Sequence, residues 1–280
     1  MKLSIVIPTI KPTLILHRQL LKIINSKMSN FEVILIHQGI KGLLKIKNKK
    51  IKYYRLHKKK LSLAKNYGIK KSSSDIITIL DDDIINNVNY FKYGLNHMLL
   101  NKEISLLFGN IINKNKKKFS INIPKTNTKI NYFNFLGCLA SSMWIRKNNY
   151  KSKKIFDENF GIGSFFGSGE ESDVVIRSLL QNKKIYFFNK YPLIHDDNQN
   201  LNCKKTFKKF FSYGLGNGAL YRKNIVNFNY KVFFLFFLNI LKSILGIFYG
   251  ILRIDNYTIF IKYFSLFLGR LIGYFKYRTR

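Results

Sequence analysis

The stretch DIITILDDDIINN, residues 75–87, decides how the rest of the sequence is interpreted. Its apolar first half predicts a buried strand, and that strand ends in Asp81, Asp82 and Asp83. Adjacent carboxylates repel one another, so the cluster is costly unless a cation compensates it. Mg²⁺ or Mn²⁺, which takes hard oxygen ligands, suits such a strand end. The residues alone leave a second interpretation open, in which the carboxylates form a turn and cap a helix near 89–100.

The segments before this stretch alternate between apolar runs and helical spacing. Strands are predicted at 3–7, 31–39 and 51–56, and helices at 14–24 and 61–71. This alternation predicts an α/β fold with a mostly parallel sheet. Ligands of such sheets bind beyond the carboxyl ends of the strands. Pro8–Thr9, His37–Gly39 and the three aspartates all follow strands, so we expect them to line one crevice.

The second half of the sequence is more mixed. A strand, a basic loop and a second strand are predicted within 106–124, and further strands within 137–150 and 184–197. Glycines in 167–180 precede a predicted helix.

The composition limits the classes of partner. The chain has 280 residues, 49 Lys and Arg against 14 Asp and Glu, and a formal net charge of +35. Nucleic acid, anionic lipid and phosphorylated substrates are the natural partners of such a chain. The abundance of Lys, Asn and Ile also fits an AT-rich genome, which leaves open how much of the charge serves function.

Cysteine usage and the first residues bear on the compartment. The two cysteines, Cys138 and Cys203, have neither metal-site spacing nor a disulfide framework, which indicates a reducing compartment. The apolar run at the start is short and contains Pro8, so no signal peptide is predicted.

Several motifs in one order resemble family 2 glycosyltransferases. LSLAKNYGIKKSSSDIITILDDD (61–83) is similar to the family's small-residue helix, Lys-Asn and Gly before a strand with an Asp-x-Asp motif. LSIVIPT (3–9) resembles its first strand. FGIGSFFGSGEESDVVIRSLL (160–180) resembles its glycine-rich loop and acidic helix start. FKKFFSYGLGNGALYRK (207–223) is similar to a Tyr-Gly-x-Gly-x-Gly stretch of polysaccharide-assembly members.

The resemblance covers residues 1–225 and implies a catalytic domain of GT-A type, with a Rossmann-like, mostly parallel central sheet flanked by helices. It implies an inverting, metal-dependent transfer of a hexosyl-type sugar from a nucleotide sugar of UDP or dTDP type. The implied acceptor is a glycan or lipid-linked sugar in cell-surface polysaccharide synthesis.

The resemblance also implies roles for single residues near the donor. Asp83 and Asp81 would hold Mg²⁺ or Mn²⁺, with His195 as a further ligand. The nucleotide sugar would contact Pro8, Thr9, Lys65, Asn66, Asp81 and Asp82. The second strand ends in His37–Gln38–Gly39, where the family usually has an Asp on the nucleobase, so the nucleobase stays open.

The acidic helix start implies the catalytic groups. Glu171 would be the catalytic base, with Glu170 orienting it or contacting the acceptor, and Asp173 would contact the acceptor. The family usually has Glu-Asp where this chain has Glu-Glu, which changes the reach of the base. Without the family, these acids are ordinary first-turn residues favoured by the helix dipole, and Arg177 is expected to pair with one of them.

Trp144 offers a face on which an acceptor sugar could stack, although a single tryptophan also fits a core position.

The composition changes from Lys231 onward, and we expect residues 226–280 to form amphipathic or apolar C-terminal helices. Residues 232–252 are long enough to span a bilayer, but Lys242 within them costs about 2.5–3.5 kcal/mol on insertion scales. Polar or small residues form one helical stripe in each half of this tail. They are Asn239, Lys242, Ser243, Gly246, Gly250 and Arg253, then Lys262, Ser265, Gly269 and Gly273.

Three interpretations of the tail stay open: helices lying in the membrane interface, a spanning hairpin, and packed core helices. The first predicts a cytoplasmic enzyme, peripheral or anchored at the inner face of the cell membrane, whose residues 231–276 contact the membrane surface.

Two other functions compete with the transferase. A nucleic-acid-binding protein fits the charge and the many aromatics, but the aromatics concentrate in the apolar tail, so no specific nucleic acid is expected. A sugar-phosphate nucleotidyltransferase generally needs a glycine-rich loop after its first strand, and PTIKPTLIL (8–16) contains no glycine.

Overall fold

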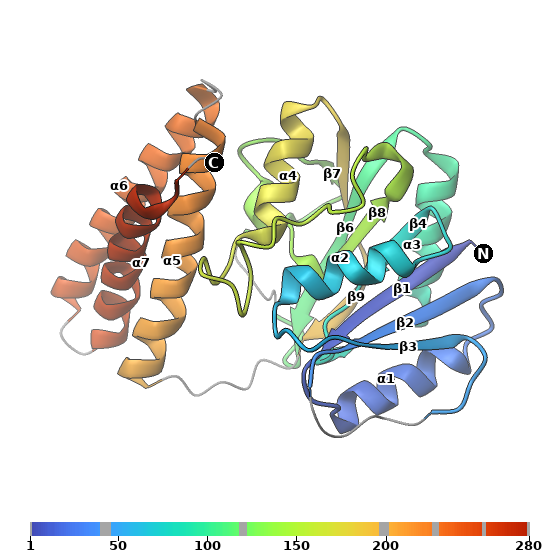
Figure 1. Cartoon of the computed structure of the whole chain (residues 1–280). Coiled ribbons are helices and arrows are strands. Elements are labelled where there is room, and N and C mark those ends of the chain that lie inside the picture. Colours follow the sequence, from blue (N-terminus) through green and yellow to red (C-terminus); the bar gives the residue numbers. More distant parts are fainter. Residues whose placement is uncertain are drawn as a thin grey trace. The chain divides into compact units, whose positions relative to one another are not determined.

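The computed structural model describes residues 2–39, 46–117, 122–195, 202–225, 230–253 and 256–278. The chain forms two compact units. Unit 1 contains Met1–Phe156 and Ser178–Asp197, and unit 2 contains Asp157–Arg177 and Asn198–Arg280 (Figure 1). The domain boundary predicted between residues 225 and 226 adjoins 226–229, which lie outside the described residues, and it stays a prediction.

Unit 1 is built on one nine-stranded sheet. Its strands are β1 (Leu3–Thr9), β2 (Phe31–His37), β3 (Ile51–Arg55), β4 (Ile76–Ile79), β5 (Ile84–Ile85), β6 (Ile104–Asn113), β7 (Thr128–Lys129), β8 (Met143–Arg146) and β9 (Lys184–His195). Its helices are α1 (Leu14–Ile24), α2 (Leu61–Lys71) and α3 (Val88–Leu100), with short 3₁₀ helices at Phe135–Gly137, Ala140–Ser142 and Lys147–Asn149.

The strand order is β3-β2-β1-β4-β8-β6-β9-β5, with β7 beside β9. Parallel ladders join β1 to β2 and β4, β2 to β3, and β6 to β9. Strand β8 separates the two parallel blocks because it runs antiparallel to both β4 and β6. Helix α2 packs on β1 and β2, and α3 packs on β6 and β9. The predicted α/β class, with a central sheet flanked by helices, is confirmed.

Local sequence signals explain most of these elements. Every residue of β1 and β2 is buried, as a continuous apolar run predicts for central parallel strands. The side chain of Thr13 caps α1 by accepting a hydrogen bond from the Leu16 amide. The helix predicted at 61–71 is α2. The second strand predicted within 106–124 falls partly on 118–121, outside the described residues, and residues 122–124 are not in a strand.

Unit 2 contains three long helices. They are α5 (Cys203–Ile225), α6 (Tyr230–Leu252) and α7 (Tyr257–Lys276), and they contact one another (Figure 1). Helix α4 (Glu170–Leu180) begins in this unit, and the division between the units passes through it at Arg177 and Ser178. The predicted apolar C-terminal helices are confirmed.

The predicted stripe of small and polar residues faces the interior of this bundle. Asn239, Ser243, Gly246 and Gly250 of α6 are buried, and so are Ser265, Gly269 and Gly273 of α7. One of the three open interpretations placed this stripe in the membrane interface, but close packing of helices requires small residues at their contact, and in the structure the stripe is the contact face. Lys242 and Arg253, in contrast, are exposed.

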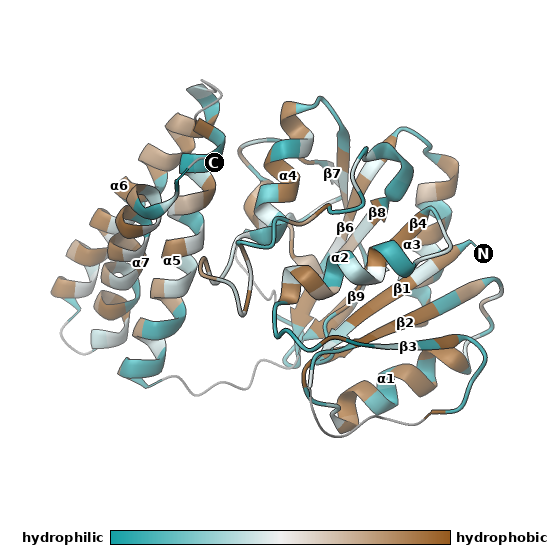
Figure 2. Cartoon of the chain, viewed as in Figure 1, coloured by the Kyte–Doolittle hydropathy of each residue, from teal (hydrophilic) through white to brown (hydrophobic). Residues whose placement is uncertain are grey.

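Helix α6 consequently carries most of its large apolar side chains on the outside, and Figure 2 shows that hydrophobic residues make up much of this helix. The exposed ones are Tyr230, Phe233, Phe234, Phe237, Leu241, Leu245, Phe248, Tyr249, Ile251 and Leu252. Inside, the Arg270 guanidinium donates hydrogen bonds to Asn217 Oδ1 at 3.1 Å and to the Asn239 carbonyl at 2.6 Å. The interior of the bundle therefore contains a polar cluster beside buried apolar residues such as Leu220 and Leu235, while most large apolar side chains of α6 face outward.

A buried carboxylate joins strands at the amino-terminal side of the sheet. Glu32 accepts hydrogen bonds from Ser4 Oγ at 2.6 Å and from the Ser73 amide at 2.8 Å, and it pairs with Lys52 Nζ at 2.7 Å. Burial alone raises the pKa of Glu32, but hydrogen bonds from Lys52, Ser4 and Ser73 outweigh it and lower the pKa to about 2. The lowered pKa means that ionised Glu32 stabilises the fold.

We expect Glu32→Gln to lower the free energy of unfolding by about 2–3 kcal/mol at pH 7. Because the folded pKa is below the unfolded one, this difference is full above about pH 4.5 and narrows as the pH falls towards 2. Urea unfolding at several pH values measures it, with exposed Glu103→Gln as control. An equal loss at pH 7 and pH 3 would contradict the assignment.

Candidate functional site

The three aspartates lie in the loop between β4 and β5, at the carboxyl end of β4. The Leu80 amide donates to the Val6 carbonyl at 3.0 Å, so the chain follows β1 up to the loop. Gln19 Nε2 of α1 donates to the Asp81 carbonyl at 3.3 Å, and Asn86 Nδ2 donates to the Gln19 carbonyl at 3.1 Å. Helix α1 therefore holds both ends of the aspartate loop.

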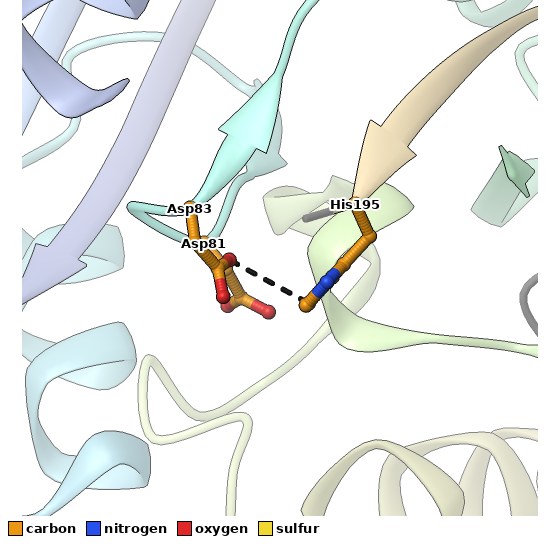
Figure 3. Close-up of side chains that lie close together, drawn as sticks. All are labelled: Asp81, Asp83 and His195. Carbon is orange, nitrogen blue, oxygen red and sulfur yellow. Dashed lines mark ion pairs between the residues drawn. The ribbon is translucent and has the colours of Figure 1, made fainter. Parts of the chain in front are cut away.

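The pairing of β5 with β9 brings a histidine to this loop. Ile84 is opposite His195 and Ile85 is opposite Ile194 in an antiparallel ladder. Asp83 directly precedes β5, and its Oδ1 lies 3.5 Å from His195 Nε2. Figure 3 shows Asp81 and Asp83 on the loop with His195 at the end of β9 directed towards them.

Asp81, Asp83 and His195 can hold a divalent metal ion. One ligand atom from each lies within 4.8 Å of the others. Two carboxylate oxygens and one imidazole nitrogen suit Mn²⁺ and, less closely, Mg²⁺. The structure thus brings together the three side chains predicted as metal ligands, although His195 is more than 100 residues from the two aspartates in sequence.

Asp82 points to the first strand instead. Thr9 Oγ1 donates a hydrogen bond of 2.5 Å to Asp82 Oδ2. Burial raises the pKa of Asp82 to about 6; the Thr9 hydrogen bond opposes this rise, and the charges of Asp83 and Asp81 add to it. Pro8 and Thr9 are the last residues of β1, so the end of this strand and the aspartate loop form one edge.

Lys65 and Asn66, predicted to contact the donor, lie on the buried face of α2. Asn66 Nδ2 donates to the Phe156 carbonyl at 2.8 Å, and its Oδ1 accepts from the Phe156 amide at 2.9 Å. Lys65 Nζ lies 5.3 Å from the centroid of the Phe156 ring. Asn66 thereby fixes the backbone just before residue 157, where the first part of unit 1 ends, and Lys65 contacts the ring of the same residue.

His37 and Gln38, at the position expected for nucleobase contacts, are buried at the end of β2. The Gln38 amide donates to the Thr9 carbonyl at 2.8 Å, which ties this end to β1. Burial, together with the charge of Arg55, lowers the pKa of His37 below its ordinary value. A neutral imidazole is therefore the form present at pH 7.

Trp144, predicted to stack on an acceptor sugar, has no exposed surface. Its Nε1 donates to the Tyr90 hydroxyl at 2.9 Å, and the Tyr90 hydroxyl donates to the Ser142 carbonyl at 2.7 Å. A buried ring offers no face to a sugar in this structure. Trp144 therefore occupies a core position, which is the alternative that the sequence left open.

In unit 2, the predicted acids Glu170, Glu171 and Asp173 occupy the first turn of α4. Glu170 is buried and Glu171 is partly exposed. Asp173 is fully buried and pairs with Arg177 Nε at 2.8 Å. This ion pair confirms the prediction that Arg177 pairs with one of the acids at the start of this helix. Lys223 Nζ of α5 also pairs with Asp173, at 2.8 Å.

Lys223 joins a second acid, Asp157 Oδ2, at 2.7 Å. Burial alone raises the pKa of Asp157, but the hydrogen bonds from Lys223 and the Asn159 amide, together with the charges of Lys223 and Arg177, hold the pKa below its ordinary value. One lysine on α5 therefore fixes both the start of the 157–177 segment and the first turn of α4.

The glycines of the Tyr-Gly-x-Gly-x-Gly stretch serve two contacts of α5. A Cβ on Gly214 or Gly218 would lie 2.5 or 2.0 Å from backbone oxygens of α7. A Cβ on Gly216 would lie 2.2 Å from the Ser168 carbonyl, in the loop just before Glu170. Real Cβ atoms do not approach so closely, so α5 packs against α7 on one face and against the glycine-rich loop on another.

Comparison with known protein families identifies the family of this chain. Residues 4–166 match the model of the family described as Glycosyl transferase family 2. The chain belongs to this family. The resemblance seen in the sequence is confirmed, and with it a glycosyltransferase rather than a nucleic-acid-binding protein or a nucleotidyltransferase. No curated protein matches the sequence.

Solved structures share the fold of this family 2 glycosyltransferase. S. aureus TarS 1–349 superposes with a TM-score of 0.62 at 12% identity, covering 97% of this chain and 90% of that one. Its complex with UDP gives 0.58 at 15%, covering 78% and 65%. Its complex with UDP-GlcNAc gives 0.52 at 14%, covering 78% and 66%. The chain spans 43% of a longer TarS structure. These likenesses confirm the GT-A fold.

Gln19 is a site residue that the sequence analysis did not single out. It is buried on the apolar face of α1 between Leu16 and Ile23, and it supports the aspartate loop. A polar residue in the apolar stripe of an amphipathic helix is a signal that could have identified it.

We expect Gly216→Ala to destabilise the chain by about 1–3 kcal/mol, because the new methyl group must displace the Ser168 backbone. In a helix without this contact, the same change stabilises by about 1 kcal/mol, so the sign of the effect is diagnostic. Thermal unfolding and sugar transfer are measured together, with exposed Lys208→Ala on the same helix as control. A stabilised, fully active variant would refute the contact.

Proposed function

We propose that this family 2 glycosyltransferase is an inverting, metal-dependent enzyme that takes a hexosyl-type sugar from a UDP or dTDP sugar. The acceptor is a glycan or a lipid-linked sugar in cell-surface polysaccharide synthesis. The structures of S. aureus TarS with UDP and UDP-GlcNAc support a nucleotide-sugar donor. The proposal depends above all on the Asp81, Asp83 and His195 cluster at the edge where β1 and β4 end.

This cluster supplies the charge that the reaction needs. The donor's diphosphate gains negative charge as it leaves the sugar, and a Mn²⁺ or Mg²⁺ ion on Asp81, Asp83 and His195 would supply the opposing charge. The side chains alone leave two carboxylates facing one imidazole, which is costly without a cation. This cost supports a bound ion as part of the working enzyme.

Residues of the neighbouring strand ends have positioning roles in this proposal. The backbone of Pro8 and Thr9 lines the nucleotide, and the Thr9 hydrogen bond orients Asp82, which accepts from the ribose. Lys65 and Asn66 act indirectly, because their contacts with Phe156 orient the backbone there. His37 lies where the base binds in the family.

Glu171 is proposed as the catalytic base. It takes the proton of the acceptor hydroxyl while that oxygen attacks the anomeric carbon from the face opposite the diphosphate, which inverts the configuration. Glu170 orients Glu171 or contacts the acceptor. Asp173 is held by Arg177 and Lys223, so its part is to hold the first turn of α4 in place.

Helices α6 and α7 are proposed to associate with the inner face of the cell membrane, so that the enzyme is cytoplasmic and peripheral or anchored. Both are long and apolar enough to cross a membrane by length and composition. The outward large apolar side chains of α6 support contact with lipid because water would penalise them. Such an anchor brings the enzyme to a lipid-linked acceptor.

The donor and the metal are tested together. We expect Mn²⁺ with UDP or dTDP to raise the thermal midpoint of the wild type, because a ligand that binds only the folded state stabilises it by about 2.7 kcal/mol at a hundredfold excess over Kd. Asp83→Asn should lose this shift and the transfer activity, whereas Glu103→Gln should keep both. Transfer is measured with UDP-, dTDP- and GDP-sugars and lipid-linked acceptors. Absence of turnover with every donor would remove the proposal.

The base is tested separately. We expect Glu171→Gln to lower kcat by about 10²–10⁴-fold while the KM for the donor stays near the wild-type value, because an amide cannot take the proton. Glu170→Gln should cost less. Steady-state kinetics measure both variants, and a Glu171→Gln enzyme with undiminished kcat would exclude this residue as the base.

A further inference from the structure

A cavity of about 340 Å³ lies in unit 2, where α5 and α7 end. It is lined by Arg222, Tyr274, Phe275, Tyr277 and Arg278. Small-molecule sites typically begin at about 300 Å³, so the cavity has the size of a small ligand or head group. None of these residues belongs to the donor site or the proposed base.

The two arginines make this cavity cationic. Neither Arg222 nor Arg278 forms an ion pair with any residue that the structure describes. Two acids, Asp157 and Asp173, act electrostatically on Tyr277, and Lys223 and Arg177 already pair with them. The cavity therefore combines two arginines with two tyrosines, and no acidic residue is among the residues that line it.

The walls of the cavity are held in place by aromatic contacts. The Arg222 guanidinium carbon lies 5.3 Å from the centroid of the Tyr274 ring. The Tyr277 ring stacks on Phe160 at 6.0 Å and lies 5.5 Å from Phe166. A cation fixed over a ring loses less side-chain entropy when it binds an anion.

Phosphate is the anion that matches this set. Guanidinium groups bind phosphate oxygens through paired N–H donors, and phenol hydroxyls add further donors. One lining residue, Phe275, is 77% exposed, and the large apolar side chains of α6 in the same unit are also exposed. This combination suits a phosphate that is carried on an apolar chain.

We propose that Arg222, Arg278 and the two tyrosines bind the terminal phosphate or diphosphate of a membrane lipid. The proposal goes beyond the transferase reaction, because it assigns a lipid-phosphate site outside the donor site. It names specific residues, whereas the exposed apolar face of α6 explains only general attraction to a membrane.

A simpler role for the arginines is to stabilise helix ends. Arg222 lies in the last turn of α5 and Arg278 follows α7, where cations interact favourably with the helix dipole. This role accounts for each arginine singly. It does not account for two arginines and two tyrosines lining one cavity.

The test uses the full chain without any sugar donor, so its result does not depend on transfer activity. Binding is measured by co-sedimentation with phosphatidylcholine vesicles that contain phosphatidic acid, or phosphatidylserine at matched surface charge. Inorganic diphosphate is the soluble competitor. The wild type should bind phosphatidic acid vesicles more strongly than phosphatidylserine vesicles, and diphosphate should abolish that preference.

The double variant Arg222→Gln/Arg278→Gln should weaken binding to phosphatidic acid vesicles by about tenfold and lose the preference. Arg222→Lys/Arg278→Lys keeps the charge but not the paired donors, so it should keep general vesicle binding and lose the preference. The control Lys204→Gln/Lys205→Gln removes two exposed charges at the start of α5 and should keep the preference. Thermal unfolding checks that all variants fold.

Three results would overturn the proposal. In one, the control Lys204→Gln/Lys205→Gln loses the preference as fully as Arg222→Gln/Arg278→Gln, which indicates that general positive charge causes the preference. In another, the arginine variant keeps the preference, which leaves the arginines with their helix ends. In the third, the wild type binds diphosphate and the arginine variant does not, but both show the same preference for phosphatidic acid vesicles over phosphatidylserine vesicles. This result would assign the cavity to a soluble phosphate instead of a lipid.

Discussion

The short ladder between β5 and β9 is the contact on which the candidate site depends. Only Ile84 and Ile85 form β5, yet their pairing with Ile194 and His195 sets an imidazole beside Asp83. Without this ladder the aspartates would end a strand with no partner from the second half of unit 1. Strand β5 is the last strand in the order, so the ladder forms one end of the sheet.

The aspartate loop shows how a costly cluster is distributed over a fold. Asp82 turns to Thr9 and is largely desolvated, while Asp81 and Asp83 face His195. The three carboxylates thus have two different environments, although they are neighbours in sequence. Glu32 is the contrasting case: its hydrogen bonds and the Lys52 ion pair favour the charged carboxylate, so the ionised side chain stabilises the sheet.

Much of unit 1 could be predicted because its signals are local. Apolar runs predicted β1, β2 and β4, and the small-residue helix at 61–71 is α2. The metal ligands were predicted by resemblance, and the structure places them together. The partners of Asn66 and Trp144 could not be predicted from local signals. Their hydrogen bonds go to Phe156 and Tyr90, which are 90 and 54 residues distant in sequence. Residue type cannot show which distant backbone a side chain meets.

In unit 2 the same limit appears in the direction of helix faces. The sequence showed a stripe of small and polar residues on each apolar helix, but only the packing of α5, α6 and α7 decided that the stripe faces inward. A glycine permits close approach of another segment, but the sequence does not show which segment approaches. Gly214 contacts α7, whereas Gly216 contacts the loop at Ser168.

The sequence by itself determined the α/β class, the order of the motifs, the family and the chemical types of the candidate ligands, because periodicity and motif order are properties of neighbouring residues. Tertiary structure alone decided that His195 reaches the aspartates, that Trp144 is buried, and that α6 carries its apolar side chains outward. Each of these outcomes depends on contacts between segments far apart in the chain, and those contacts follow from strand register and helix packing, which no local pattern specifies.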